Sequence, residues 1–300
     1  MPFATIDIGT NAVLLLIGEK AADGKITSIH ESAELTRLGQ GLGSSNRLHP
    51  DGMQRTLDTL KAYADICKKY QASPIVAVGT SAFRRATNAQ EFVDRIQKET
   101  GIQVQIISGD EEASLSFDAA RAEFGDNILV IDIGGGSTEF IWKTAQGLHT
   151  QSLKLGAVTL QENYGQHDPL GTEDAVEMEG AVLEYLGMLP ESALADTKGL
   201  TMVGIAGTVT TLAAMTLQLE KYDHEQVHGH VLSMADVERI LSDLLPLSTE
   251  ERKKLPGLEP KRADVIYPGA LILEEAMEHF GKNSIVACHH GIRWGLAYRL

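Results

Sequence analysis

Two stretches of the sequence place an acidic residue, a glycine and a small polar residue directly after an apolar run. Asp7 begins "DIGTNAV" behind residues 3–6, and Asp132 begins "DIGGGSTEF" behind residues 128–131. A glycine after a strand permits a tight turn and lets backbone N–H groups approach an anion. The carboxylate can hold Mg²⁺, which neutralises phosphate charge. The repeated pattern predicts two phosphate-binding turns, although Asp-x-Gly also occurs in ordinary turns.

Two further turns have residues that suit phosphate. "GIAGTVTTLAA" places Gly207 and Thr208 between a predicted strand and a helix N-terminus, where free N–H groups and the helix dipole attract anions. Close helix packing is the alternative reason for Gly207. Arg84 follows the turn at residues 79–81, where a planar guanidinium can bind phosphate with two hydrogen bonds. A solvated surface charge is the alternative interpretation of Arg84.

Other motifs give weaker signals or exclude a class. The P-loop pattern GxxxxGK[ST] does not occur, and "GQGLGS" at Gly39 lacks the rest of a dinucleotide-binding fingerprint. His228-Gly-His230 and His289-His290 fit no familiar metal-site spacing. These histidines are therefore interpreted as hydrogen-bonded or solvated side chains.

The elements that must position these residues follow one order twice. The first half reads as three strands and then helices alternating with strands, β-β-β-α-β-α-β-α, with strands expected near residues 3–6, 12–17, 26–38, 75–78 and 102–107. The order restarts at residue 128, after a plausible hinge at residues 124–127, and is then interrupted by helical insertions. We therefore expect a duplicated α/β protein with domains at 1–124 and 125–300 and a cleft between them.

Composition restricts the function. The formal charge of −15 and the pI near 5.1 argue against nucleic acid and membrane surfaces as partners, because both attract summed positive charge. The two cysteines, Cys67 and Cys288, are far apart and form no CxxC motif, which indicates a reducing compartment. Neither a signal peptide nor an apolar run of about 18 residues is present. The sequence therefore predicts a cytoplasmic protein.

A family resemblance extends along the chain. The motifs are "DIGTN", "RLGQGL", "VGTSAFRRATN", "IISGDEEA", "VIDIGGGSTE", "LKLGAVTL", "GIAGTVTTLAA", "LPGLEPKRADVIYPGALIL" and "HHGIRWGL". In them the chain resembles the Ppx/GppA phosphatases, exopolyphosphatases and guanosine pentaphosphate phosphohydrolases in the superfamily of acetate and sugar kinases, heat-shock chaperones and actin. It looks like the short, two-domain form. One departure is Thr159 in "GAVTL", where many members carry arginine.

The resemblance implies an actin-like fold and specific residue roles. Glu112 would activate the attacking water, and Mg²⁺, with Mn²⁺ as a substitute, would be held by Asp132, Glu139 and Asp7. The implied phosphate-binding residues are Thr10, Asn11, Arg84, Gly134, Gly135, Gly136, Ser137, Gly207 and Thr208. A homodimer and a link to the stringent response are also implied by the family alone.

The sequence thus predicts a hydrolase of terminal phosphoanhydrides, with inorganic polyphosphate as substrate. Guanosine pentaphosphate (pppGpp) is the alternative substrate. An ATP-dependent kinase or an actin-like filament module are further alternatives, but a kinase does not need the glutamates of "SGDEEA". In that motif Ser108 and Glu111 have the spacing of a capping box, which leaves Glu112, about 100° further round the helix, available for chemistry.

Overall fold

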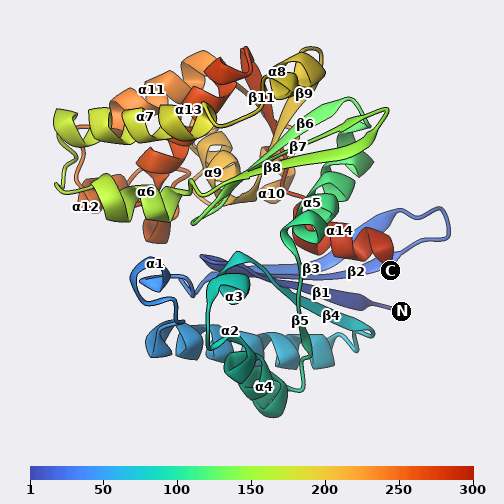
Figure 1. Ribbon diagram of the computed structural model, residues 1–300. Helices are drawn as coiled ribbons and strands as arrows, with labels where there is room; N and C mark the ends of the chain where they lie inside the picture. The colour runs from blue at the N-terminus through green and yellow to red at the C-terminus, as the bar shows by residue number, and fades with distance from the viewer. The chain divides into compact units, whose positions relative to one another are not determined.

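The computed structural model describes residues 1–43 and 45–300 in full. By compactness the chain divides into unit 1, residues 1–119 with 291–300, and unit 2, residues 120–290. Figure 1 labels the elements of both units. The domain limits at residues 124 and 125 stay a prediction.

Unit 1 is built on a five-stranded mixed sheet. Its strands are β1 (Phe3–Ile8), β2 (Ala12–Lys20), β3 (Ile26–Leu35), β4 (Ile75–Gly79) and β5 (Val104–Ile106), in the order β3-β2-β1-β4-β5. The first three strands form an antiparallel meander, and β4 and β5 continue the sheet in parallel with β1. The helices are α1 (Leu42–Ser45), α2 (Pro50–Lys69), α3 (Ser81–Arg85), α4 (Ala89–Thr100), α5 (Gly109–Phe124) and α14 (Ile292–Arg299), and the last turn of α5, from residue 120, belongs to unit 2.

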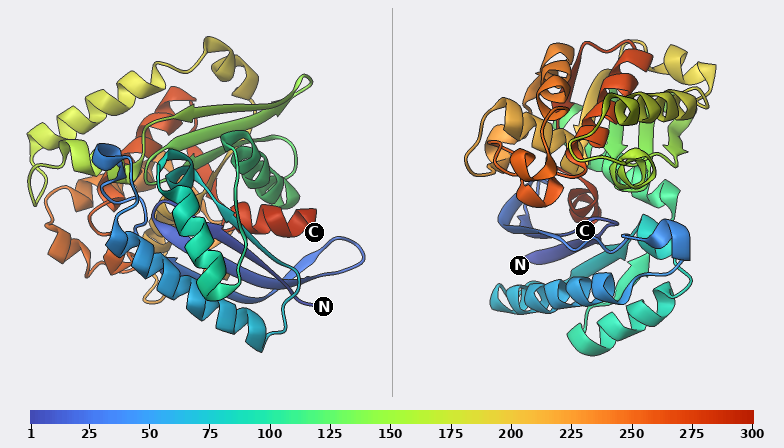
Figure 2. Two further views of the ribbon diagram at one scale, coloured as in Figure 1. Left: turned by 60° about the horizontal axis from the view of Figure 1, so that its bottom comes forward. Right: turned by 90° about the vertical axis from the view of Figure 1, so that its left-hand side faces the viewer.

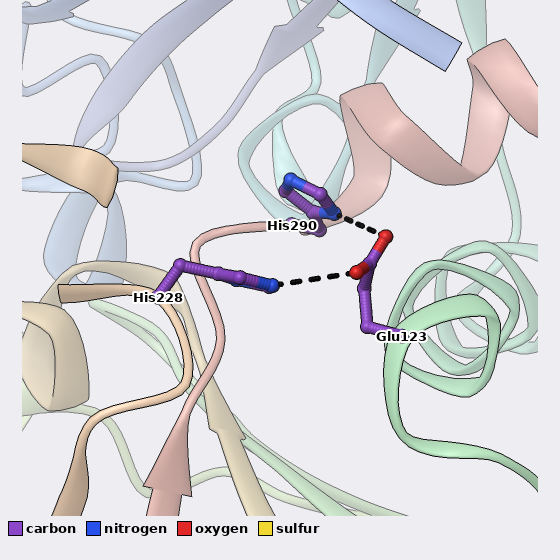
Figure 3. A group of neighbouring side chains, drawn as sticks. All are labelled: Glu123, His228 and His290. Atoms are coloured by element: carbon purple, nitrogen blue, oxygen red, sulfur yellow. Dashed lines mark ion pairs between the residues drawn. The ribbon is translucent and has the colours of Figure 1, made fainter. Parts of the chain in front are cut away.

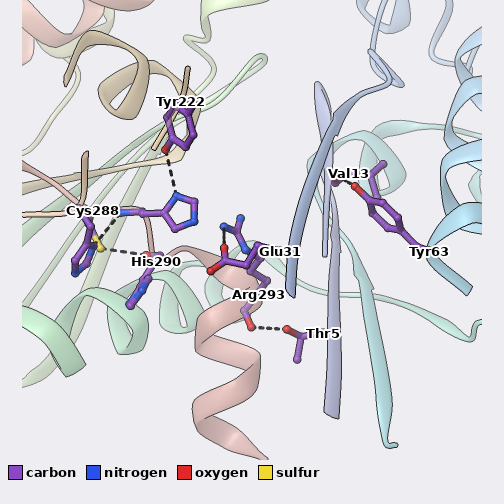
Figure 4. Close-up of polar contacts among 10 residues, drawn as sticks. Thr5, Val13, Glu31, Tyr63, Tyr222, Cys288, His290 and Arg293 are labelled. Atoms are coloured by element: carbon purple, nitrogen blue, oxygen red, sulfur yellow. Dashed lines mark hydrogen bonds and ion pairs between the residues drawn. The ribbon is translucent and has the colours of Figure 1, made fainter. Parts of the chain in front are cut away.

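Helices cover both faces of this sheet, which explains why every residue of its central strand β1 is buried. On β2, Leu15 belongs to a core that includes residues of α2 and α4, whereas its neighbour Leu16 packs with Trp294 of α14 on the opposite face. Figure 2 shows α2 and α4 on one face. The chain end is tied to the sheet by polar contacts: the Thr5 hydroxyl donates to the Arg293 carbonyl at 2.8 Å, and the Arg293 guanidinium pairs with a Glu31 carboxylate oxygen at 2.6 Å (Figure 4).

Unit 2 contains a six-stranded sheet with the order β10-β11-β9-β6-β7-β8. The strands are β6 (Ile128–Ile133), β7 (Thr138–Thr144), β8 (Gly147–Leu153), β9 (Thr201–Ile205), β10 (Val231–Ser233) and β11 (Ser284–Ala287). The helices are α6 (Ala157–Tyr164), α7 (Thr172–Leu186), α8 (Glu191–Thr197), α9 (Ala206–Thr216), α10 (His224–Val227), α11 (Met234–Leu244), α12 (Thr249–Arg252), the 3₁₀ turn η1 (Pro260–Arg262) and α13 (Ile266–His279).

The helices of unit 2 pack around α13, which is buried along most of its length and contacts α6, α7, α9 and α11. Its sequence "IYPGALILEEAMEH" is apolar on nearly every side until the two glutamates, as expected for a central helix. Among the described residues, none of the helices combines the length and the apolar character that a membrane crossing requires.

The two sheets share one strand order. Read from the meander, unit 1 is β3-β2-β1-β4-β5 and unit 2 is β8-β7-β6-β9-β11, with β10 added at the edge. The central strands β1 and β6 both run into Asp-Ile-Gly. The predicted duplicated α/β fold is thereby confirmed. The short strand β10 was not predicted from the sequence, because its three residues lie directly before a strongly amphipathic helix.

Candidate functional site

In unit 1 the candidate residues follow the ends of neighbouring parallel strands. Ile8 of β1 is in register with Gly79 of β4, and Gly79 is in register with Ile106 of β5. The turns after the three strands therefore lie at one edge of the sheet, the usual place for ligand-binding residues in α/β proteins. Thr80, in the middle turn, is buried, and its backbone N–H donates to the Ile8 carbonyl at 3.3 Å.

The first turn is held by the segment "RLGQGL". The Gly9 N–H donates to the Ala12 carbonyl at 2.9 Å, and the carbonyl of Thr10 accepts from the Gly39 N–H at 2.8 Å. A Cβ atom at Gly39 would lie 2.2 Å from the Thr10 methyl carbon, so a larger residue there would displace the Thr10 side chain. The Asn11 carbonyl accepts from the N–H of Arg37 at 2.9 Å. The glycines that resembled a fragment of a dinucleotide fingerprint thus support the Thr10–Asn11 turn.

Asp7 is a buried carboxylate beside this turn. Only 8% of the residue is exposed, and its Oδ1 has no hydrogen-bond partner among the described residues. Burial, with a smaller effect of the Glu112 charge, raises the pKa of Asp7 to about 7, while Arg293 acts in the opposite direction. A buried carboxylate oxygen without a donor is costly. A cation would remove this cost, so Asp7 fits the predicted Mg²⁺.

Glu112 lies in the first turn of α5 and contacts Arg84. The two side chains form an ion pair at 2.5 Å, and the Arg84 guanidinium also donates to the Ile107 carbonyl at 3.2 Å. Burial raises the pKa of the Glu112 carboxyl, and Arg84 opposes this rise by charge and by hydrogen bonding. The structure thus brings the predicted base and the predicted phosphate-binding arginine into direct contact.

The neighbouring glutamate has a different environment. The Ser108 hydroxyl accepts from the backbone N–H of Glu111 at 3.1 Å, which is the first of the two capping-box bonds. The second bond, from the Ser108 N–H to the Glu111 carboxylate, is absent among the described residues. Ser108 therefore caps α5 as predicted, while the predicted contribution of the Glu111 side chain to the box is not formed.

In unit 2 the two predicted metal ligands lie side by side on the neighbouring strands β6 and β7. Asp132 and Glu139 are directly opposite in the antiparallel register, so their side chains point to the same face of the sheet with Cβ atoms roughly 5 Å apart. Glu139 is buried and accepts a hydrogen bond from the Ser152 hydroxyl at 2.8 Å. This pair of oxygen donors suits a hard cation such as Mg²⁺.

The glycine turn between β6 and β7 is supported by α6. The N–H of Ala157 donates to the Gly134 carbonyl at 3.0 Å, and those of Val158 and Thr159 donate to the Gly135 carbonyl at 2.9 and 3.0 Å. The turn is closed by a bond from the Gly134 N–H to the Ser137 carbonyl, which leaves Gly136 at its tip. The first N–H groups of α6 are thus bonded to the turn.

Thr159, the departure from the family pattern, closes this cap. Its hydroxyl accepts from the Gly156 N–H at 3.2 Å and donates to the Gly156 carbonyl at 3.0 Å. A Cβ atom at Gly156 would lie 2.4 Å from the backbone of Gly135 and Gly136. Residues 156–159 therefore hold the backbone of the glycine turn in place.

The third turn lies at the same edge of this sheet, because Ile205 at the end of β9 is in register with Asp132. Ala206 adopts a positive φ of 65°, and the Thr208 hydroxyl donates to the Ile133 carbonyl at 3.4 Å. A Cβ atom at Gly207 would lie 2.1 Å from a guanidinium nitrogen of Arg262. Gly207 thus permits close approach of an arginine to the start of α9.

Arg262 is a residue that sequence reasoning counted only among the cations that could attract an anionic substrate, without a specific role. Its side chain is 19% exposed, and its guanidinium lies 3.9 Å from the Glu259 carboxylate. The sequence marks Arg262 only as part of the basic pair in "EPKRAD", and the chain has many other charged residues. Its place beside Gly207 depends on the η1 turn, which local pattern does not reveal.

The predicted residues thus form two groups. Unit 1 contains Asp7, Thr10, Asn11, Arg84 and Glu112, and unit 2 contains Asp132, Gly134, Gly135, Gly136, Ser137, Glu139, Gly207 and Thr208. Each group lies at the strand ends of its own sheet. The two sheets have the same strand order, and in each the central strand leads through Asp-Ile-Gly into a polar turn. This arrangement defines an α/β protein of the actin-like class.

Comparison with known proteins then gives the family. The family model described as Ppx/GppA phosphatase family matches residues 17–300, and the chain belongs to this family of hydrolases. The chain is 32% identical to exopolyphosphatase 2 of Mycobacterium tuberculosis over 99% of this chain and 98% of that one. It is also 36% identical to a bifunctional 3-dehydroquinate synthase/phosphatase of Fusobacterium nucleatum, over 94% of this chain but only 44% of that protein's length.

Solved structures agree with this assignment. The chain is similar to an exopolyphosphatase from Cytophaga hutchinsonii, with a TM-score of 0.90 and 31% identity over 99% of this chain and 97% of that one. It is also similar to the Ppx/GppA family member of Aquifex aeolicus, with a TM-score of 0.83 and 31% identity over 100% and 97% of the two chains. The predicted family and enzyme class are confirmed.

Proposed function

We propose that this chain is an exopolyphosphatase that hydrolyses terminal phosphoanhydride bonds of inorganic polyphosphate. The observation that supports this most is Glu112, a largely buried carboxylate at a helix N-terminus, paired with Arg84 beside the phosphate-type turns of unit 1. The names of the relatives, exopolyphosphatases over nearly the full length of this chain, favour the same substrate.

Glu112 acts as the general base in this proposal. The ionised carboxylate takes a proton from the attacking water, the water oxygen bonds to the terminal phosphorus, and the bond to the bridging oxygen breaks. The shortened chain and orthophosphate leave. Arg84 favours the ionised form of Glu112 and supplies donors for phosphate oxygens.

The turns and carboxylates provide the electrostatic part. Backbone N–H groups of residues 135–137 and 206–208 and the hydroxyls of Thr10 and Ser137 offer donors to phosphate oxygens, and Arg262 adds a cation. Asp132 and Glu139 are the proposed ligands of Mg²⁺ in unit 2, and Asp7 is the carboxylate of unit 1 that fits a cation. When bound, this ion neutralises the charge that develops on the transferred phosphoryl group.

A substrate panel tests the proposal. Phosphate release is measured from long-chain polyphosphate, tripolyphosphate, pppGpp and ATP, each with Mg²⁺ and with chelator. We expect the highest kcat/KM on polyphosphate, and activity only with the metal. Faster release from pppGpp would make it the substrate instead, and release from none of the four would contradict the proposed class.

Two variants test the metal ligands. Asp132→Asn and Glu139→Gln each remove one of the two facing carboxylates while leaving the shape of the side chain almost unchanged. We expect both to lose activity at low Mg²⁺ and to regain part of it at high Mg²⁺. Full activity of both variants in chelator would exclude these residues as metal ligands.

A further inference from the structure

Three side chains of unit 2 that are separate from the proposed catalytic residues converge on one point. Glu123 lies on the last turn of α5, His228 directly follows α10, and His290 follows β11 (Figure 3). One donor atom from each lies within 4.8 Å of the others. Sequence analysis treated the two histidine pairs separately, whereas the fold brings together one member of each.

The distances in this group are close to those between the ligand atoms of a metal ion, with each histidine nearest to a different oxygen of the Glu123 carboxylate. The His228 Nε2 lies 3.5 Å from one Glu123 carboxylate oxygen, and the His290 Nδ1 lies 3.2 Å from the other. Charge-assisted N–H···O bonds are shorter, about 2.7–2.9 Å. Ligand atoms bound tetrahedrally at about 2.0–2.1 Å are roughly 3.3 Å apart, which is close to both distances.

The surroundings hold the ligands in place. The imidazole rings of His228 and His290 stack with centroids 4.4 Å apart, and the Phe124 ring lies 5.5 Å from that of His228. The loops that carry the histidines are joined by backbone bonds of 2.8 Å from Gly229 to Ala287 and from Ala287 to His230. The Cys288 thiol donates to the His290 carbonyl at 3.3 Å (Figure 4).

We propose that Glu123, His228 and His290 bind a first-row transition-metal ion, with Zn²⁺ the best fit. Two imidazoles and one carboxylate suit Zn²⁺, and leave a fourth position to water. Mg²⁺ is a poor fit, because it binds through oxygen and requires octahedral geometry. This site differs in ligand type from the proposed Mg²⁺ site.

Binding changes the tautomer of His228. The Nδ1 of His228 accepts a hydrogen bond from the backbone N–H of His289 at 3.2 Å, so in the metal-free state the neutral ring has its proton on Nε2. A metal ion bound at Nε2 takes the place of that proton, which transfers to Nδ1 by way of solvent. The bond from the His289 N–H is then lost, which lowers the affinity but supplies a spectroscopic signature.

The ion would join the two ends of unit 2. This unit begins at residue 120 and ends at residue 290, and Glu123 and His290 lie beside these ends. A link that closes so long a loop removes conformational entropy from the unfolded chain. Binding to the folded state alone also raises stability with ion concentration. Zn²⁺ should therefore raise the Tm.

The binding test uses the full-length chain freed of metal with chelator. Isothermal titration with ZnCl₂ should show one site, and Glu123→Gln or His228→Ala should weaken it by more than the 10–100-fold that loss of an outer-shell partner costs. His224→Ala is the matched control, because His224 stacks on His289 in the same histidine-rich region but is not in the group. Equal loss in the control, or no saturable site, would overturn the proposal.

The tautomer test is independent of affinity. ¹⁵N-detected histidine spectra should show His228 as the Nε2–H form without metal and as the Nδ1–H form with Zn²⁺, together with a Zn²⁺-dependent rise in Tm that Glu123→Gln abolishes. An unchanged tautomer at saturating Zn²⁺, with no rise in Tm, would show that these side chains form only a hydrogen-bonded cluster.

Discussion

At the scale of single residues, Glu111 and Glu112 are adjacent but differ in their contacts. Only the backbone N–H of Glu111 takes part in the cap, whereas the side chain of Glu112 is largely buried against Arg84. We expect Glu112→Gln to lower turnover roughly 10²- to 10⁴-fold, the usual contribution of a general base. Glu111→Gln should retain most activity. Turnover and thermal unfolding of both purified variants provide the measurement.

The alternative is that both glutamates only stabilise the start of α5 through the helix dipole. Each would then contribute about 0.3–1 kcal/mol and the two variants would have similar activity. Comparable turnover, or a loss in Glu112→Gln that unfolding explains, would remove Glu112 from the mechanism.

Arg84 should influence the pH dependence of the reaction. Because Arg84 lowers the pKa of Glu112, its removal leaves burial unopposed and the pKa of that carboxyl rises. The base must be ionised, so in Arg84→Ala the acidic limb of the kcat/KM profile should move to higher pH, together with weaker use of substrate. Arg85→Ala and Lys253→Ala are the exposed controls. If all three variants behave alike, the arginine acts only through diffuse attraction.

At the scale of elements, two glycines allow a matched comparison. In Gly156→Ala the new methyl group would lie 2.4 Å from the backbone of the glycine turn, so we expect a loss of roughly 1–3 kcal/mol in the free energy of unfolding and a large loss of activity. Gly180 is exposed in the middle of α7, and a Cβ atom there meets nothing within 4 Å. Gly180→Ala should therefore gain about 0.5–1 kcal/mol with unchanged activity. Stability is measured by denaturant unfolding and activity by phosphate release for both variants. Similar effects of the two changes would contradict the role of Gly156.

A second prediction at this scale concerns Glu275 of α13. Burial and the charges of Glu179, Glu274 and Glu278 raise its pKa from 4.5 to about 7. Between these values the folded state keeps a proton that the unfolded state releases, so this group lowers stability as pH rises from about 4.5 to about 7. The loss is complete above pH 7 and amounts to at most roughly 3 kcal/mol.

Glu275→Gln removes this pH dependence. The variant should be more stable than the parent protein above pH 7 and similar to it near pH 4, as measured by urea unfolding across the range. Glu184→Gln, an exposed change on α7, is the control. Equal pH slopes in parent and Glu275→Gln would contradict the raised pKa.

The elements also show what sequence patterns can predict. The repeated meanders follow from the local alternation of apolar and polar residues, which the sequence shows. The pairing of Asp132 with Glu139 follows from the single tight turn between them. The edge strand β10 has only three residues and precedes an amphipathic helix, so its hydrophobic pattern cannot be distinguished from the start of that helix. Because β10 aligns the loop of His228 with that of His290, the metal-type cluster was also beyond sequence reasoning. The position of Arg262 beside Gly207 was not predicted either, because tertiary packing brings these two residues together.

At the scale of the whole molecule, the proposed reaction is cleavage of the terminal phosphoanhydride of polyphosphate by water, with Glu112 as base. Reaction in ¹⁸O-labelled water with Mg²⁺, followed by mass spectrometry of the products, tests it most directly. We expect one ¹⁸O atom in each released orthophosphate, shortening from chain ends, and a matching rate loss in Glu112→Gln. Unlabelled phosphate transferred to an acceptor, or label in internal fragments, would contradict the account.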